Sequence, residues 1–289
     1  MLRLASVASV LALCLATHPA RCQTPMERSD LGVASKIAPA WFGPNAFPVP
    51  ELPSVAVRPY AEIAARWYGG FIAPGDEDTT VDIAFRAGVP LFSERVTLNM
   101  WGVVREFWSF GPQTAALRRV ASEGKGSRLG DIYVSTDILA LKESAVCPSL
   151  VLRAAVKTAS GGDFVNARYY DSAGYFFDAA VSKSFAFGGY VSALRISATT
   201  GFLCWQTDNA RQNDAAEYGL AVAVSSKAAD LECFWGGYAG WEKDGDRPMV
   251  VRARLDVRTG GRLRPFVHFL RGLRDYPFTG AGIGLRLDF

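Results

Sequence analysis

Few side chains in this sequence could carry out covalent or hydrolytic chemistry. Of the two histidines, one lies near the N-terminus and the other, His268, stands in the segment 265–271 with no Ser two residues further on. A hydrolase needs a His beside a Ser, Asp or Asn that it activates or that orients it. We therefore expect no catalytic residue, no cofactor and no enzymatic activity.

The sequence also lacks residue patterns typical of metal or nucleic-acid binding. Cys147, Cys204 and Cys233 follow the N-terminal region without a metal-like spacing, so we expect free thiols or small apolar side chains. Asp244 and Asp246 lack the pattern of a calcium loop. The formal net charge is +3 and no basic run occurs, which gives no indication of nucleic-acid binding.

The chemistry that the sequence does offer is a series of charged side chains inside short alternating segments. The segment 81–89 has apolar residues at odd positions and carries Asp82 and Arg86 at even ones, and 251–257 follows the same pattern with Arg252. A period of two places the apolar and charged side chains on opposite faces of a β-strand.

Twelve segments of this kind follow one another along the chain. They lie at about 55–67, 79–90, 96–107, 130–141, 150–158, 174–184, 190–203, 216–226, 232–242, 248–258, 264–273 and 279–289. Long connections follow the first four odd-numbered segments, and short ones follow the even-numbered segments and the last two odd-numbered ones. An even number of strands with this asymmetry is typical of a transmembrane β-barrel with both termini in the periplasm.

We therefore predict an all-β fold, a single antiparallel up-and-down transmembrane β-barrel of about 12 strands over residues 54–289. A soluble β-sandwich or lipocalin-like barrel also alternates and is the alternative. Residues 1–22 have the charged start, apolar stretch and small residues of a signal peptide. Residues 23–53 form an irregular Pro-rich segment, either a periplasmic leader or a segment inside the lumen.

With the apolar faces toward lipid, the charged faces line the lumen. The expected lumen-lining charges are Glu62, Arg66, Asp82, Arg86, Arg105, Asp137, Arg153, Lys157, Asp178, Arg195, Glu217, Arg252, Arg254, Asp256, Arg258, Arg286 and Asp288. They form either a structural lattice of ion pairs or a polar conduit that favours anions.

Aromatic and polar residues also gather at the expected outer ends of the strands. Those that we place at an extracellular mouth are Tyr170, Trp205, Gln206, Trp241, Arg274 and Tyr276. Trp and Tyr at this level equally suit a membrane aromatic girdle. The loop 109–129 adds Arg118, Arg119, Lys125 and Arg128, which either contact lipopolysaccharide phosphates or form a basic lid.

Beyond this pattern, the chain resembles uncharacterised porin-like outer-membrane β-barrel proteins of Bacteroidota. The resemblance rests on the segments 42–50, 130–137, 152–161, 174–178 and 204–209. It implies the outer membrane of a Gram-negative bacterium, with lipid and lipopolysaccharide around the barrel. In outer-membrane barrels a terminal aromatic such as Phe289 belongs to the signal that the barrel-assembly machinery recognises. The resemblance implies no established activity.

The charged lumen leads us to predict a passive channel for small polar or anionic solutes, with the loops 109–129 and 159–173 restricting its mouth. The alternative is a closed barrel that acts as a structural or accessory subunit of an envelope complex.

Overall fold

The structure is a computed structural model that describes residues 38–92, 94–120, 124–207, 213–241, 243 and 245–289. The predicted signal peptide and residues 23–37 lie outside this part of the chain. No helix within it is both long and apolar enough to cross a membrane.

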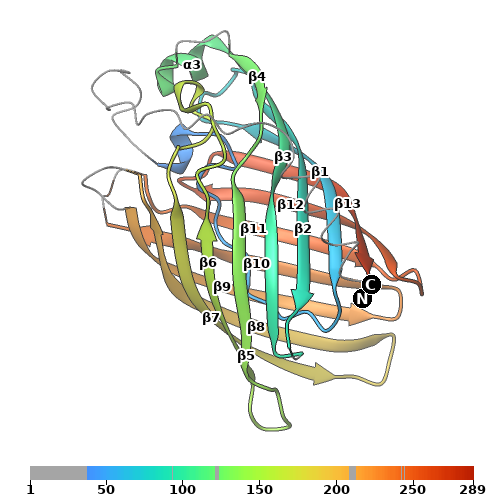
Figure 1. The fold of residues 1–289 in the computed structure, drawn as a ribbon. Helices are drawn as coiled ribbons and strands as arrows, with labels where there is room; N and C mark the ends of the chain where they lie inside the picture. The colour runs from blue at the N-terminus through green and yellow to red at the C-terminus, as the bar shows by residue number, and fades with distance from the viewer. Residues whose placement is uncertain (1–37, 93, 121–123, 208–212, 242, 244) are drawn as a thin grey trace. The chain divides into compact units, whose positions relative to one another are not determined.

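Twelve strands form a closed antiparallel β-barrel (Figure 1). They are β1 (Tyr60–Gly70), β2 (Asp78–Pro90), β3 (Val96–Phe110), β5 (Ile132–Leu141), β6 (Ser149–Lys157), β7 (Gly174–Ala186), β8 (Val191–Trp205), β9 (Asn213–Ser226), β10 (Ala229–Gly240), β11 (Met249–Val257), β12 (Leu263–Arg274) and β13 (Phe278–Asp288). The short strand β4 (Lys125–Arg128) pairs only with β3, and the helix α3 (Pro112–Arg118) precedes it. The predicted fold class and strand number are confirmed.

Pairing between the first and last strands closes the ring. Tyr60 of β1 faces Asp288 of β13, and Gly70 faces Phe278. We call the end where β1 begins and β13 finishes the terminal end, and the opposite one the loop end. The terminal end has the short turns, while the connections 111–131 and 158–173 lie at the loop end. The predicted alternation of short and long connections is confirmed.

The two faces of the wall differ as the alternation predicts. Val81 and Ile83 are exposed on the outside, whereas Asp82 between them is fully buried inside. On β13, Ile283 and Phe289 are exposed on the apolar outer face. A soluble barrel would bury its apolar face, so this arrangement excludes the soluble alternative.

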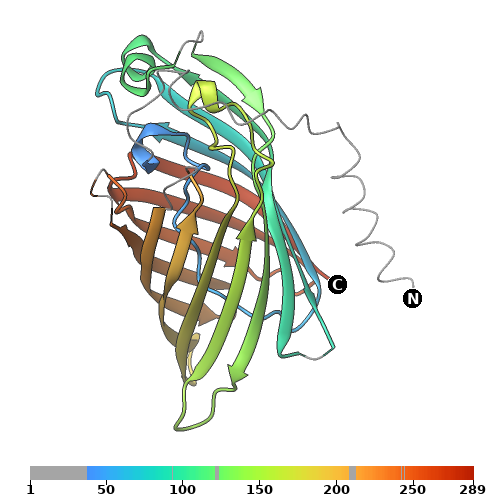
Figure 2. The ribbon, with the colours of Figure 1, turned by 60° about the vertical axis from the view of Figure 1, so that its left-hand side comes forward.

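Residues 38–59 lie inside the barrel, and we call them the luminal segment (Figure 2). It begins at the loop end with the 3-10 helix η1 (Pro39–Trp41) and reaches the terminal end before β1. The first strand starts at Tyr60 rather than near residue 55 because 54–59 still belong to this segment. There the Ser54 amide donates to Asp137 Oδ2 at 2.9 Å, and the Ala56 amide donates to Thr97 Oγ1 at 2.8 Å.

Candidate functional site: the barrel lumen

The loop half of the lumen is filled by aromatic side chains packed around the luminal segment. Phe42 is fully buried, with its ring centroid 5.3 Å from that of Phe47 and 5.9 Å from that of Tyr170. Phe47 in turn contacts Trp205, which packs against Tyr238. The apolar cluster therefore closes the lumen at the loop end.

Three ion pairs reinforce this closure, and almost no water reaches them. Arg168 Nη2 lies 2.7 Å from Glu106 Oε1, with both side chains 0% exposed. Lys157 is paired with Asp131 at 2.6 Å, again with both side chains 0% exposed, and Arg118 is paired with Asp78 at 2.8 Å. Arg118 therefore faces protein rather than lipopolysaccharide. Removing one partner from such a pair would leave an uncompensated buried charge.

The luminal segment takes part in this polar network through Asn45. Its amide nitrogen donates to Asp82 Oδ2 and to Glu106 Oε2, both at 2.8 Å. Its amide oxygen accepts a hydrogen bond from Arg66 Nη2 at 3.0 Å, and Arg66 also binds Asp82. One side chain of the luminal segment thus links β1, β2 and β3 across the interior.

Further along, barrel side chains bind the backbone of the luminal segment. Tyr276 donates to the carbonyl of Pro44 at 2.7 Å, and Tyr238 donates to that of Phe47 at 3.3 Å. Arg252 donates to the carbonyl oxygens of Val49 and Pro50. These donors fix a segment whose prolines contribute no amide hydrogen of their own.

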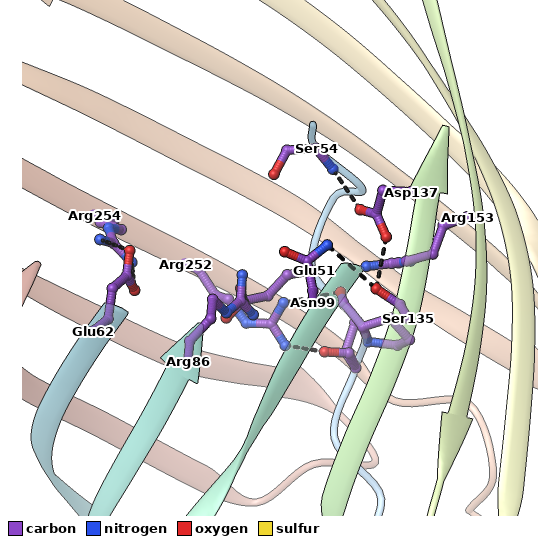
Figure 3. A network of polar contacts seen from close by, with 12 residues as sticks. Glu51, Ser54, Glu62, Arg86, Asn99, Ser135, Asp137, Arg153, Arg252 and Arg254 are labelled. Carbon is purple, nitrogen blue, oxygen red and sulfur yellow. Dashed lines mark hydrogen bonds and ion pairs between the residues drawn. The ribbon is translucent and has the colours of Figure 1, made fainter. Parts of the chain in front are cut away.

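The side chain of Glu51 extends from the luminal segment toward Arg86 of the barrel wall (Figure 3). Its carboxylate lies 2.5 Å from Arg86 Nη2, and 54% of its side chain is exposed to the interior. The Arg86 guanidinium lowers the pKa of Glu51 to about 2, so this carboxyl stays ionised.

The terminal half contains a network of partly exposed charges. Arg254 binds Glu62 at 3.0 Å and Asp256 at 2.8 Å, as Figure 3 shows for Glu62. Arg286 binds Glu62 at 3.1 Å and Asp288 at 2.9 Å. Carboxylates therefore neutralise the charges of both Arg254 and Arg286.

A cavity of about 640 Å³ extends through the lumen from Asp131 and Trp205, at the edge of the aromatic cluster, into this half. The luminal segment lines it through Glu51, and the wall lines it through Arg86, Arg195 and Glu232. It reaches Arg264 near the terminal end. The lumen is thus closed at the loop end and hollow toward the terminal end.

Most residues expected in the lumen point into it, but two do not lie where alternation places them. Arg105 is exposed on the outer face, where it donates to Ser127 of β4 at 2.6 Å. The register between β2 and β3 shifts at Ile83/Ala84, so Glu106 takes the inward position instead. The expected lumen position of Arg105 is therefore wrong. Arg258 follows β11 and pairs with Asp230 at 2.6 Å, exposed at the terminal end.

The remaining expected lumen charges are Asp137, Arg153 and Asp178, which lie on neighbouring strands. Arg153 binds Asp178 at 2.5 Å and lies 3.9 Å from Glu217, and all three are buried. Asp137 accepts a hydrogen bond from Ser135 as well as from the luminal segment.

The six residues expected at the mouth separate into two groups. Trp205 and Tyr276 are buried against the luminal segment, and Tyr170 packs there too. Trp241 is 60% exposed, while Gln206 and Arg274 are exposed at the loop end. The structure therefore brings only the first three together, and they fill the lumen instead of surrounding an opening.

The sequence analysis did not identify several polar residues of the interior, among them Asn45, Glu51, Glu106 and Glu232 and the ion-pair partners Asp78, Asp131 and Arg168. Two of them belong to the luminal segment, which has no periodicity to follow. Glu106 was missed because of the bulge, for which the adjacent apolar pair Val103-Val104 was the available signal.

His268 lines the cavity beside Gly282, and its Nε2 has no hydrogen-bond partner within the described residues. The same part of the chain contains no group of three or more His, Cys, Asp or Glu side chains suited to a metal ion. Cys147, Cys204 and Cys233 are free thiols.

Solved structures of outer-membrane β-barrels have a similar fold. The chain is similar to an outer-membrane channel from Pseudomonas putida F1, with a TM-score of 0.56, 12% identity, and coverage of 82% of this chain and 97% of that one. It is also similar to the NanC porin, with a TM-score of 0.52, 8% identity, and coverage of 79% and 100%. No protein-family model and no curated protein matches the sequence. Identities this low show a shared fold alone.

Proposed function

We propose that the protein is a passive outer-membrane channel for small polar solutes, with no catalytic activity. The observation that carries the proposal is the charged cavity inside a closed barrel whose outer face is apolar. Eight arginines and six carboxylates line this cavity, which gives a small basic excess and a slight preference for anions. The similar channel and porin folds support this assignment.

In this proposal the terminal end faces the periplasm and the loop end faces outward, among lipopolysaccharide. Short turns at one end and long loops at the other support this orientation. Phe289 would then be the periplasmic signal for the barrel-assembly machinery, as a terminal aromatic residue is in other outer-membrane barrels.

The luminal segment controls passage, because it fills the loop half of the lumen. A solute that enters the cavity from the terminal end meets Asn45 and the aromatic cluster of Phe42 and Phe47. Conduction therefore requires displacement of this segment. Its clamp at Arg252 lies next to the cavity and is the contact most easily weakened without disturbing the buried ion pairs.

Planar-bilayer recording of the purified full chain tests the proposal. We expect rare conducting steps for the unmodified protein and at least tenfold more frequent steps for Arg252→Gln, which loses donors to the Val49 and Pro50 carbonyls. Arg258→Gln is the matched control, because its partner Asp230 lies at the terminal end. No steps from any of the three, with a folded barrel shown by heat-modifiable gel mobility, would refute the channel.

A closed barrel that serves as a structural or accessory subunit is the second candidate. The dry ion pairs and aromatic cluster of the loop half favour it. In that case Arg252→Gln would lower the unfolding free energy and leave the bilayer silent.

A further inference from the structure

The cavity lies between the luminal segment and one particular part of the wall. Strands β7, β8 and β9 face it with small side chains, among them Ser182, Ser197 and Ala223. The clamps on the luminal segment, by contrast, come mainly from β1 to β5 and from β10 to β12, through residues such as Arg252. Because the side chains of one wall are small and the luminal segment is held against the rest of the wall, space remains in the lumen for a bound solute beside that segment.

Two charges differ from the rest: Arg195 on β8 of this wall and Glu232 on the adjoining strand β10. Arg195 and Glu232 both face the cavity, both are exposed, and neither has a hydrogen bond or ion pair within the described residues. Other cavity charges do have partners, as Arg86 does in Glu51 and Arg264 in Asp288. Arg195 and Arg254 attract Glu232 electrostatically, but neither Arg195 nor Glu232 forms a close ion pair within the described residues, so one cation and one anion remain available to a solute.

Their spacing limits what that solute can be. Arg195 and Glu232 both pair in register with Ala223, from opposite sides of β9. Two strand spacings separate their Cα atoms by about 9–10 Å. A solute that satisfies both needs an anionic and a cationic group, and the two long side chains can adjust to the distance between them. An extended chain of three amino acids spans about 10 Å, with an ammonium at one end and a carboxylate at the other.

The lumen already accommodates an extended peptide, namely its own luminal segment. Most of the contacts involve backbone atoms: Tyr276, Tyr238 and Arg252 donate to carbonyl oxygens, while Thr97 and Asp137 accept from amides. Every peptide presents these groups. The cavity volume of about 640 Å³ falls within the range of small-ligand sites, roughly 300–1,000 Å³.

We infer that the cavity binds short peptides with free termini, the carboxylate at Arg195 and the ammonium at Glu232. This inference rests on the proposed channel function and names its substrate class. The peptide lies extended along the small-residue wall, beside the luminal segment. Neither charge gives up a hydrogen bond or a close ion pair within the described residues on binding, so the peptide termini compete with water and with the attraction of Glu232 to Arg195 and Arg254.

Calorimetric titration of the full chain in detergent micelles tests this assignment. The probes are trialanine, N-acetyl-trialanine, trialanine amide and the doubly capped peptide. We expect trialanine to bind at least tenfold more tightly than each capped form. Arg195→Gln should reduce the affinity for trialanine to that for its amide, and Glu232→Gln should reduce it to that for N-acetyl-trialanine.

Arg264→Gln is the matched control, because Arg264 lines the same cavity but is paired with Asp288. It should keep the preference for free termini. Equal binding of all four peptides would overturn the inference, as would N-acetyl-trialanine binding as tightly as trialanine, which marks a simple anion site. Because titration requires no conduction, a silent bilayer with an intact peptide preference would refute the channel and not the binding site.

Discussion

The loop half and the terminal half of the lumen both contain ion pairs, but water reaches them very differently. Arg168 and Glu106 in the loop half are 0% exposed, whereas Arg286 in the terminal half is 27% exposed. The first pair lies among aromatic rings and the second lies beside the cavity. Arginine–carboxylate pairs therefore help to close the lumen in the loop half, whereas in the terminal half they line a hydrated cavity.

The difference has an energetic consequence. Breaking a dry pair leaves a buried charge without compensation, at a cost of about 3–5 kcal/mol. An exposed pair contributes about 0–1 kcal/mol, because water screens it. Stability should therefore depend on the loop half, which leaves the terminal half free to change with the solute.

The largest expected effect comes from Arg168→Leu. It strands Glu106 inside the aromatic cluster, so we expect the unfolding free energy in urea to fall by about 3–5 kcal/mol. Arg286→Leu is the matched variant in the terminal half and should cost less than about 1 kcal/mol, because Arg254 still binds Glu62. Equal costs for the two variants would abolish the distinction between the halves.

Gly43→Ala tests how tightly the luminal segment fits the loop half. A Cβ at this position would lie 2.6 Å from Arg168 Nη2, and that guanidinium is fixed by Glu106 and Thr80. We expect a loss of about 1–3 kcal/mol in the same urea titration. Gly162→Ala, whose Cβ would meet nothing closer than 3.9 Å, should be neutral. A neutral Gly43→Ala would show that the segment adjusts easily.

Tyr276→Phe removes one clamp on the luminal segment without changing its packing. The Pro44 carbonyl loses its donor at 2.7 Å, and we expect a cost of about 1 kcal/mol. Tyr190→Phe, at a 70% exposed side chain, is the control and should have no effect. Indistinguishable unfolding curves for the two variants would mean that this hydrogen bond contributes nothing.

The smallest expected effect is the change with pH in the contribution of Glu51 to the unfolding free energy. Its pKa falls from 4.5 to about 2 beside Arg86, so its stabilising contribution is complete above pH 4.5 and is lost as the pH falls through 2. Because the side chain is half-exposed, the contribution is under about 1 kcal/mol. The stability difference between the unmodified protein and Glu51→Gln should therefore shrink from pH 5 to pH 3. In an Arg86→Gln background it should change less with pH, because Arg86 is the largest of the charges that lower this pKa and Arg252 and Arg254 remain.

The barrel was predictable because period-two alternation is a local property of each strand. Asp82 and its apolar neighbours show which face is inside without reference to any other strand. The bulge near Val104 reverses the face within one strand, and alternation alone placed Arg105 on the wrong side.

The interior was much less predictable. Glu51 and Asn45 sit in a Pro-rich segment without periodicity, and their partners Arg86, Asp82 and Glu106 are distant in sequence. Tyr276 and Trp205 were expected at a mouth because strand ends do carry aromatic residues. Only the position of the luminal segment turns them inward.

The register between β1 and β13 has a consequence for the order of assembly. The chain region that precedes the first strand lies at the centre, and the wall around it is completed only when Tyr60 pairs with Asp288. Contacts as distant as Tyr276 to Pro44, 232 positions apart, form inside that wall. Closing the ring around a segment already in place avoids threading Phe42 and Phe47 lengthwise through a narrow bore. The luminal segment is thus enclosed by a ring whose closing contact joins the two ends of the strand sequence, and this long-range pairing is of the kind that slows folding.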